Sequence, residues 1–148
     1  MYEFTYSKAS SVEDAASQFG EAEEGKFMSG GMTLLPTLKQ RLARPSNVID
    51  LAQLPEMAGI DVSADTVSIK AMTCHAAVAS SPHVQKAIPA LAKLAGGIGD
   101  PMVRNRGTIG GSLANNDPAA DYPGSVVGLG ATIPVSYTHL TLPTKRIV

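Results

Sequence analysis

The first apolar pattern in the chain has the spacing of a helix. Ser10 precedes Glu13 by three residues, the spacing of a capping box, so we expect a helix to begin there. Gly20 is expected to end it with a left-handed residue. The apolar positions between them recur at intervals of three and four residues and predict one buried face. They are Val12, Ala15, Ala16 and Phe19.

Two short β-rich runs flank a second helical pattern. Residues 26–28 lead into a glycine pair, and residues 47–51 follow the pattern after Pro45. Strand, glycine turn, helix and strand in this order predict a small β-α-β unit over residues 1–52. The leucines that define the helix are Leu34, Leu35, Leu38 and Leu42.

Beyond Pro55 the pattern changes. Residues 58–62 and 66–70 are short β-rich runs that predict a hairpin and a second sheet. Thr73 is expected to cap a helical turn, and a later apolar stripe predicts a helix that ends at Gly96. Residues 96–116 are expected to form a long loop, followed by a helix-like stretch around 126–129 and a strand at 132–134. The stripe consists of Ile88, Leu91, Leu94 and Ala95.

Composition and charge narrow the possible functions. The 148 residues are 44% hydrophobic and 17% charged, with a net charge of −1, which suits a globular protein and gives no bulk attraction to nucleic acid. No run is long enough to insert into a membrane, so we expect a cytoplasmic protein. Cys74 is the only cysteine, so a cluster that needs several thiolates belongs elsewhere. We expect Cys74 to be buried, and His75 and His83 to lie at the surface or at helix caps.

Two glycine pairs are the main chemical signal. Gly30-Gly31 lies between a strand-like run and a helix-prone stretch, and Gly110-Gly111 has a similar setting. Because glycine lacks Cβ, the main chain can approach an oxygen closely and direct successive N–H groups toward it. One such pair is weak evidence, since most are plain turns. Two pairs in a small chain predict a site that holds one diphosphate between them.

Polar residues near the second pair extend this site. Thr108 and Ser112 are expected to donate hydroxyl hydrogen bonds to phosphate, and Asp121 to accept from sugar hydroxyls. Arg104 and Arg106 are expected to fix the loop rather than neutralise phosphate, because arginine readily hydrogen-bonds carbonyl groups. Asp117 precedes Pro118, a pair typical of a turn.

The end of the chain has a different character. Residues 135–148 look like the translation of a sequencing adapter, and we expect them to be non-native. The alternative is a genuine β-rich tail, since threonine, tyrosine and leucine suit a strand. If the tail is foreign, the open reading frame is interrupted within a domain, and the chain by itself is expected to be inactive.

The segment from Gly99 to Pro123, which contains Arg104-Asn105-Arg106-Gly107 and Thr108-Ile109-Gly110-Gly111-Ser112, resembles a known family. It is similar to the FAD-binding medium subunit of molybdenum hydroxylases of the carbon monoxide dehydrogenase and xanthine dehydrogenase type. The resemblance covers residues 1–134. It implies an α+β fold with two FAD-binding subdomains of the vanillyl-alcohol-oxidase-like (PCMH) type, the second of them incomplete.

The resemblance also implies boundaries and site residues. Residues 1–54 would form the first subdomain, residues 55–134 part of the second, and residues 135–148 the foreign tail. Met32 stands where relatives often carry a polar residue, so one side-chain contact differs. The residues implied to bind FAD are Ser29, Gly30, Gly31, Met32, Thr33, Ile98, Thr108, Ile109, Gly110, Gly111, Ser112 and Asp121.

By the same resemblance, electrons would arrive from the iron-sulfur clusters of a small subunit. They would originate at a molybdopterin large subunit and leave through FAD to an external acceptor. Flavin carries this chemistry, so no catalytic side chain is expected on this chain. Two alternatives stay open: a stand-alone FAD-dependent oxidase or reductase of the same fold, and a non-catalytic nucleotide-binding module.

Overall fold

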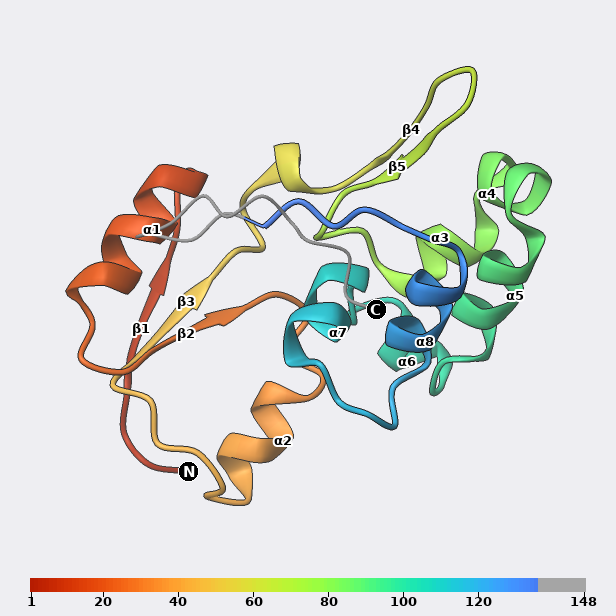
Figure 1. Ribbon diagram of the computed structural model, residues 1–148. Helices are drawn as coiled ribbons and strands as arrows, with labels where there is room; N and C mark the ends of the chain where they lie inside the picture. The colour runs from red at the N-terminus through yellow and green to blue at the C-terminus, as the bar shows by residue number, and fades with distance from the viewer. Residues whose placement is uncertain (136–148) are drawn as a thin grey trace.

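The computed structural model describes residues 1–135, and the predicted foreign tail lies almost wholly outside them. We call residues 1–54 the N-terminal lobe and residues 55–135 the C-terminal lobe (Figure 1). The N-terminal lobe contains β1 (Thr5–Lys8), α1 (Val12–Glu21), β2 (Gly25–Met28), α2 (Leu34–Lys39) and β3 (Asn47–Asp50). The C-terminal lobe contains η1 (Pro55–Met57), β4 (Ile60–Val62), β5 (Val67–Ile69), α3 (His75–Ser80), α4 (Pro82–Ala87), α5 (Pro89–Gly97), α6 (Pro101–Arg104), α7 (Ile109–Asn115) and α8 (Asp121–Gly128).

The N-terminal lobe is built on a three-stranded parallel sheet in the order β1-β3-β2, which confirms the predicted β-α-β unit. The central strand β3 is buried, because it has a neighbour on each edge and helix α1 against it. Ser29 follows directly after the carboxyl end of β2, the end of a parallel strand where ligands bind in open α/β sheets. The sheet therefore places the first glycine pair at the carboxyl end of its strands, a position suited to ligand binding.

Helix α1 differs from its prediction at both ends. Its N-cap is Ser11 rather than Ser10, and the Ser11 Oγ accepts from the Asp14 N–H at 3.1 Å. Asp14 in turn accepts from the Ser10 N–H at 2.7 Å, so the capping interactions form one residue later than expected. Gly20 does not end the helix, which continues to Glu21 and leaves through an extended Ala22.

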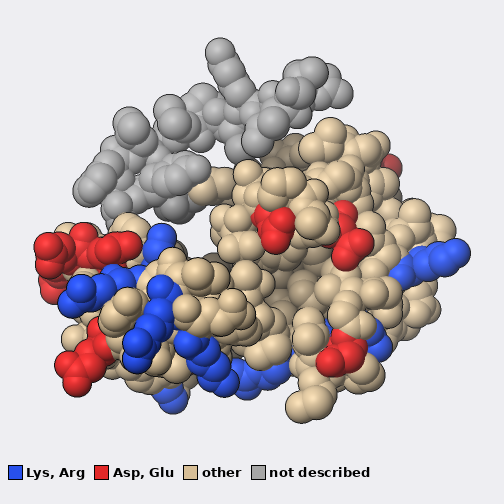
Figure 2. Space-filling model, turned by 90° about the horizontal axis from the view of Figure 1, so that it is seen from below, with Lys and Arg blue, Asp and Glu red and all other residues tan. Residues whose placement is uncertain are grey.

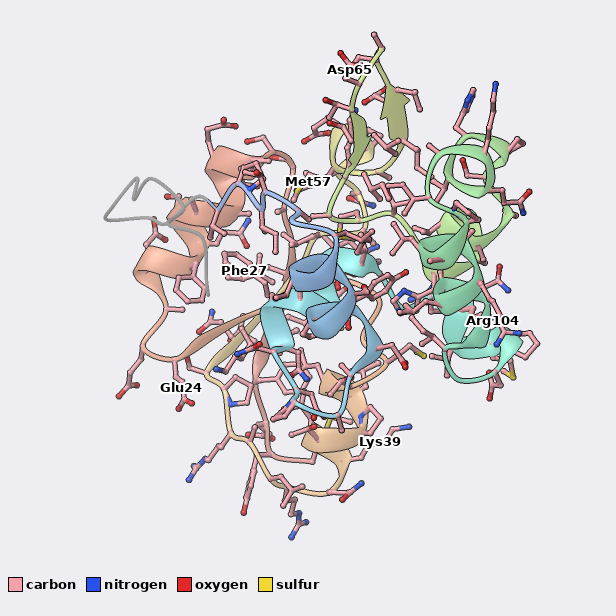
Figure 3. The ribbon with its side chains drawn as sticks, turned by 45° about the vertical axis from the view of Figure 1, so that its right-hand side comes forward. Glu24, Phe27, Lys39, Met57, Asp65 and Arg104 are labelled. Carbon is pink, nitrogen blue, oxygen red and sulfur yellow. The ribbon has the colours of Figure 1, made fainter. Side chains whose placement is uncertain are left out.

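The core of the N-terminal lobe lies between α1 and the sheet. Phe19 on α1 stacks on Phe27 of β2 with ring centroids 4.7 Å apart, and Figure 3 shows Phe27 facing that helix. Leu42, which was predicted to extend the apolar face of α2, is 73% exposed and follows the end of that helix. The buried core residues are Ala9, Ala15, Ile49 and Leu54.

The C-terminal lobe combines the predicted hairpin with a set of short helices. β4 and β5 pair in antiparallel register, which confirms the hairpin. Helix α5 carries the predicted stripe from Leu91 onward, with Ile88 as its N-cap, and packs against α3 and α4 (Figure 1). The buried core of this lobe comprises Val78, Val84, Leu91, Ala92, Ala95, Ile109 and Tyr122.

Three predictions for the C-terminal lobe are wrong. Thr73 does not cap α3, whose N-cap is Cys74; its hydroxyl instead donates to the Gly59 carbonyl at 2.9 Å and accepts from the Gly59 N–H at 3.0 Å. Residues 96–116 are not one long loop, because they contain α6 and α7. Residues 132–134 form no strand.

Helix α7 is seated on the turn before α3 through a glycine. The Gly110 N–H donates to the Ala71 carbonyl at 2.8 Å, and a Cβ on Gly110 would lie 2.6 Å from the Ala71 Cβ. Such a distance is below any ordinary carbon contact, so no side chain fits there. Gly110 therefore serves packing within the C-terminal lobe.

We predict opposite effects for two helical glycine variants. Gly110→Ala should lower the free energy of unfolding by about 1–3 kcal/mol, because its methyl group overpacks against Ala71. Gly124→Ala in α8 is the matched control: nothing lies within 4 Å of its Cβ position, so it should stabilise by up to about 1 kcal/mol. Urea unfolding of the full chain measures both, and equal effects would contradict this assignment.

Candidate cofactor-binding site

The two glycine-containing segments meet in space. Thr108 Oγ1 donates to Ser29 Oγ at 3.0 Å, although the two residues are 79 positions apart in the sequence. A Cβ on Gly30 would overlap the Arg106 carbonyl, and one on Gly111 would overlap Ser29 Oγ. Figure 1 shows α7 beside the turn that follows β2. The predicted juxtaposition of the two glycine pairs is thus present in the structure.

The first segment, residues 29–33, carries a row of uncommitted donors. None of its five main-chain N–H groups donates a hydrogen bond to another residue in the described part of the chain. Gly31 has a φ of +74°, a left-handed conformation that side chains disfavour, and its carbonyl accepts from the Leu35 N–H at 2.9 Å. Because buried N–H groups are normally paired, consecutive free ones on buried Gly30 and Gly31 fit an anion as the missing acceptor.

In the second segment, residues 108–112, the main-chain N–H groups of Ile109 to Ser112 are already hydrogen-bonded within the described residues. Ile109 donates to the Thr73 carbonyl at 3.0 Å, and Gly110 is held by Ala71. Gly111 donates to Thr108 Oγ1 at 3.1 Å, and Ser112 to the Thr108 carbonyl at 3.1 Å. The two segments are therefore unlike: the first offers main-chain donors, and the second offers side-chain hydroxyl groups and a rigid wall.

The remaining predicted site residues lie on other parts of the structure. Met32 is half-buried and Thr33 is exposed at the start of α2. Ile98 packs against the core of the C-terminal lobe, and Asp121 is exposed at the first position of α8. Ser112 is half-buried on α7. Binding of a ligand by any of these residues stays a prediction.

The loop before α6 is fixed by an arginine, as expected. Arg104 donates from one guanidinium nitrogen to the carbonyls of Ile98 at 3.1 Å and Gly99 at 2.9 Å. The carbonyl of Arg106, rather than its side chain, covers Gly30. Asp117 accepts from the Ala119 N–H at 2.9 Å, which confirms the predicted turn.

The sequence analysis did not predict that two polar residues near the second segment, His75 and Tyr122, are buried. His75 is only 5% exposed, which contradicts the expected surface or capping role, and Tyr122 is fully buried. Their rings lie 5.3 Å apart, and neither His75 Nδ1 nor the Tyr122 hydroxyl has a hydrogen-bond partner among the described residues. Burial lowers the pKa of His75, and burial followed by the charge of Asp121 raises the pKa of Tyr122.

His75 supports the second segment directly. Its main-chain N–H donates to the Gly107 carbonyl at 3.0 Å, and a Cβ on Gly107 would lie 2.6 Å from His75 Nε2. The loop backbone thus rests on the imidazole ring. A pattern of apolar spacing cannot reveal this, because histidine carries no hydrophobic signal. Cys74, expected to be buried, is half-buried, with Sγ 4.0 Å from the Arg106 carbonyl.

Neither the ion pairing nor the open surface hollow found in residues 1–135 involves a predicted site residue. The ion pair found in residues 1–135 joins Lys70 and Asp61 at 3.7 Å on the hairpin. Figure 2 shows Lys and Arg gathered mainly on one side of the face it presents, with Asp and Glu at both sides. An open hollow of about 610 Å³ near Tyr2 and Ser46 contains none of the predicted site residues. Within the same residues no group of three potential metal ligands occurs, and no helix is long and apolar enough to cross a membrane.

The fold and the paired segments define an α+β protein. The main-chain N–H groups of residues 29–33, which we call the cradle, lie where its two lobes meet. The family described as the FAD binding domain in molybdopterin dehydrogenase matches residues 2–142. The chain therefore belongs to this family of FAD-binding domains.

Individual relatives agree with this assignment. The carbon monoxide dehydrogenase medium chain of Hydrogenophaga pseudoflava is 42% identical over 129 residues, which cover 86% of this chain and 45% of that protein. The nicotine 6-hydroxylase medium subunit of Paenarthrobacter nicotinovorans is 38% identical over 130 residues, covering 88% and 46%. These relatives are subunits of oxidoreductases, and the chain spans less than half of their length.

Solved structures show the same fold. Carbon monoxide dehydrogenase from Hydrogenophaga pseudoflava, in a form that lacks the Mo-pyranopterin moiety, superposes with a TM-score of 0.83 at 42% identity, covering 85% of this chain and 44% of that one. Quinoline 2-oxidoreductase from Pseudomonas putida 86 gives a TM-score of 0.83 at 34% identity, covering 86% and 45%. The mixed helix and strand architecture is thus that of this family.

We predict that His75 makes the stability of the fold depend on pH. Its pKa in the folded chain is below the ordinary value of 6.5, so the unfolded chain takes up a proton at higher pH than the folded chain. The free energy of unfolding should therefore be fully retained above pH 6.5 and fall as the pH drops from there to the lowered pKa.

Urea unfolding at several pH values between about 5 and 7.5, around the ordinary histidine pKa, checks this. His75→Gln should flatten the dependence, whereas His83→Gln, on the exposed surface of α4, should leave it in place. An unchanged slope in His75→Gln would show that another group is responsible.

Proposed function

We propose that this chain is the FAD-binding part of the medium subunit of a molybdenum hydroxylase. In this role it passes electrons from the iron-sulfur clusters of a partner subunit through FAD to an external acceptor. The finer fold assignment, a PCMH-type domain with an incomplete second subdomain, is part of the proposal. The observation that carries it is the row of five N–H groups at residues 29–33 that have no partner among residues 1–135, set against the hydroxyl groups of the second segment.

The residues present fit the diphosphate of FAD. Main-chain N–H groups of Ser29 to Thr33 would surround its oxygens, and the left-handed φ of +74° at Gly31 gives the turn a conformation that side chains disfavour. Ser112 would donate its hydroxyl from α7, and Asp121 would accept from the ribose. Bound FAD would supply the capacity to accept and release electrons singly or in pairs. The chain itself binds and orients.

The proposed partners are an iron-sulfur small subunit and a molybdopterin large subunit. One cysteine cannot supply the several thiolates of an iron-sulfur cluster, so these 148 residues cannot hold such a cluster by themselves. The printed names of relatives as medium subunits or as members of a dehydrogenase complex support this arrangement. Co-purification of the chain with such subunits, when they are co-expressed, tests it separately from FAD binding.

We predict that Gly31→Ala weakens FAD binding about tenfold or more. A side chain at a φ of +74° costs about 1–2 kcal/mol, and its Cβ would lie 3.1 Å from Leu35 Cδ1, so the cradle must distort. Gly20→Ala is the matched control, because nothing lies within 4 Å of its Cβ position and α1 is remote from the cradle. Quenching of flavin fluorescence on titration of the full chain measures the affinity, and circular dichroism verifies folding.

The same titration separates the alternatives. A chain that binds ADP as tightly as FAD, and whose preparation shows no flavin absorbance bleached by dithionite, is a nucleotide-binding module. Equal affinities for FAD in the unaltered chain and in folded Gly31→Ala would remove the cradle from the site. Turnover of a small substrate without partner subunits would favour a stand-alone oxidase or reductase.

A further inference from the structure

We propose that Thr108 acts on the bound anion through Ser29, as the middle member of a directed hydrogen-bond chain that joins the two lobes. In this chain the Gly111 N–H donates to Thr108 Oγ1, Thr108 donates to Ser29 Oγ, and the Ser29 hydrogen is left for a phosphate oxygen. The proposal rests on the proposed function, because it assigns a role within the same diphosphate site. It makes Thr108 a positioning residue rather than a ligand contact.

Burial separates the roles of the two hydroxyl groups. Thr108 is 4% exposed, held as the N-cap of α7 with φ −119° and ψ 153°. Ser29 is half-buried and follows β2 at the open edge of the sheet. A ligand in the cradle can therefore reach Ser29, whereas Thr108 Oγ1 lies behind it with both of its contacts, Gly111 N at 3.1 Å and Ser29 Oγ at 3.0 Å, inside the protein.

The chemistry of the ligand sets the direction of the chain. A hydroxyl group has one hydrogen to donate and two lone pairs. If Ser29 donated to Thr108, it would face the ligand with lone pairs only, and a phosphate oxygen also has only lone pairs. An anion therefore selects the opposite direction, in which Thr108 donates to Ser29 and Ser29 donates outward. Hydrogen bonds in such a series polarise one another, so each strengthens the next.

The hydrogen bond between Thr108 and Ser29 also connects the two lobes. Apart from the local turn in which the Met57 N–H donates to the Leu54 carbonyl, it is the single hydrogen bond between residues 1–54 and residues 55–135. No ion pair joins the lobes within these residues. The series of hydrogen bonds from Gly111 through Thr108 to Ser29 thus couples ligand binding at residues 29–33 to the alignment of α7 with β2.

The test is a double-mutant cycle on FAD affinity in the full chain. Thr108→Val should weaken binding about tenfold, as expected when a hydrogen bond that supports a charged ligand is lost. Thr108→Ser, which keeps the hydroxyl, should restore affinity to within about twofold. In a Ser29→Ala background, Thr108→Val should cost less than about twofold more, because the relay is already broken.

Ser112→Ala is the matched comparison. Its hydroxyl is predicted to reach the ligand without Ser29, so its effect should add to that of Ser29→Ala. Thr108→Val that weakens binding equally with and without Ser29 would overturn the relay and leave FAD binding intact. An unaltered chain that binds neither FAD nor inorganic pyrophosphate would instead overturn the proposed function, and the relay with it.

A further measurement applies if Thr108→Val does not fold. Amide hydrogen exchange at Gly111 in the unaltered protein should slow when inorganic pyrophosphate is added, because the Gly111 N–H is the first donor in the series of hydrogen bonds. If exchange slows at residues 29–33 but stays unchanged at Gly111, the ligand is held without the relay, and the proposal is wrong.

Discussion

The close approach of two backbones is the constraint on which the structure depends. Residues 29–30 and 106–111 touch so tightly that a single methyl group at Gly30 would overlap the Arg106 carbonyl. The hydroxyl pair of Ser29 and Thr108 lies in the same contact. The rest of each lobe is held mainly by its own apolar core, and Met57, just past the boundary, packs against the core of the N-terminal lobe. Away from the connection at Met57, the junction that joins the two lobes is therefore also the candidate site.

Local periodicity predicted much of the fold. The β-α-β unit and the hairpin follow from short β-rich runs and helical spacing, signals that depend on neighbouring residues. The wrong predictions concern segments whose secondary structure is determined by tertiary packing or by helix capping. Asp100 caps α6 with Pro101 at its first position, and Thr108 caps α7, so a glycine-rich segment that resembled a loop is helical. Gly20 lies within α1, which ends one residue later at Glu21 and is followed by an extended Ala22.

The candidate site was predictable in its composition but not in its division of labour. Both glycine pairs were expected to present main-chain donors to one ligand. Among the described residues, the N–H groups of the pair Gly30-Gly31 have no partner, whereas those of Gly110 and Gly111 donate to Ala71 and Thr108. No single-sequence pattern reports which donors are already engaged, since that depends on partners far along the chain. The burial of His75 was missed for the same reason.

The order β1-β3-β2 has a consequence for biosynthesis. β1 and β2 do not pair with each other, and each waits for β3 to enter between them. On the ribosome the segment around Gly30 emerges well before Asn47–Asp50, so the strand that leads into it lacks its partner during that interval. Non-local parallel pairing of this kind is slow to form and leaves strand edges open meanwhile. The nascent chain thus exposes its most glycine-dependent turn before any sheet exists to shape it.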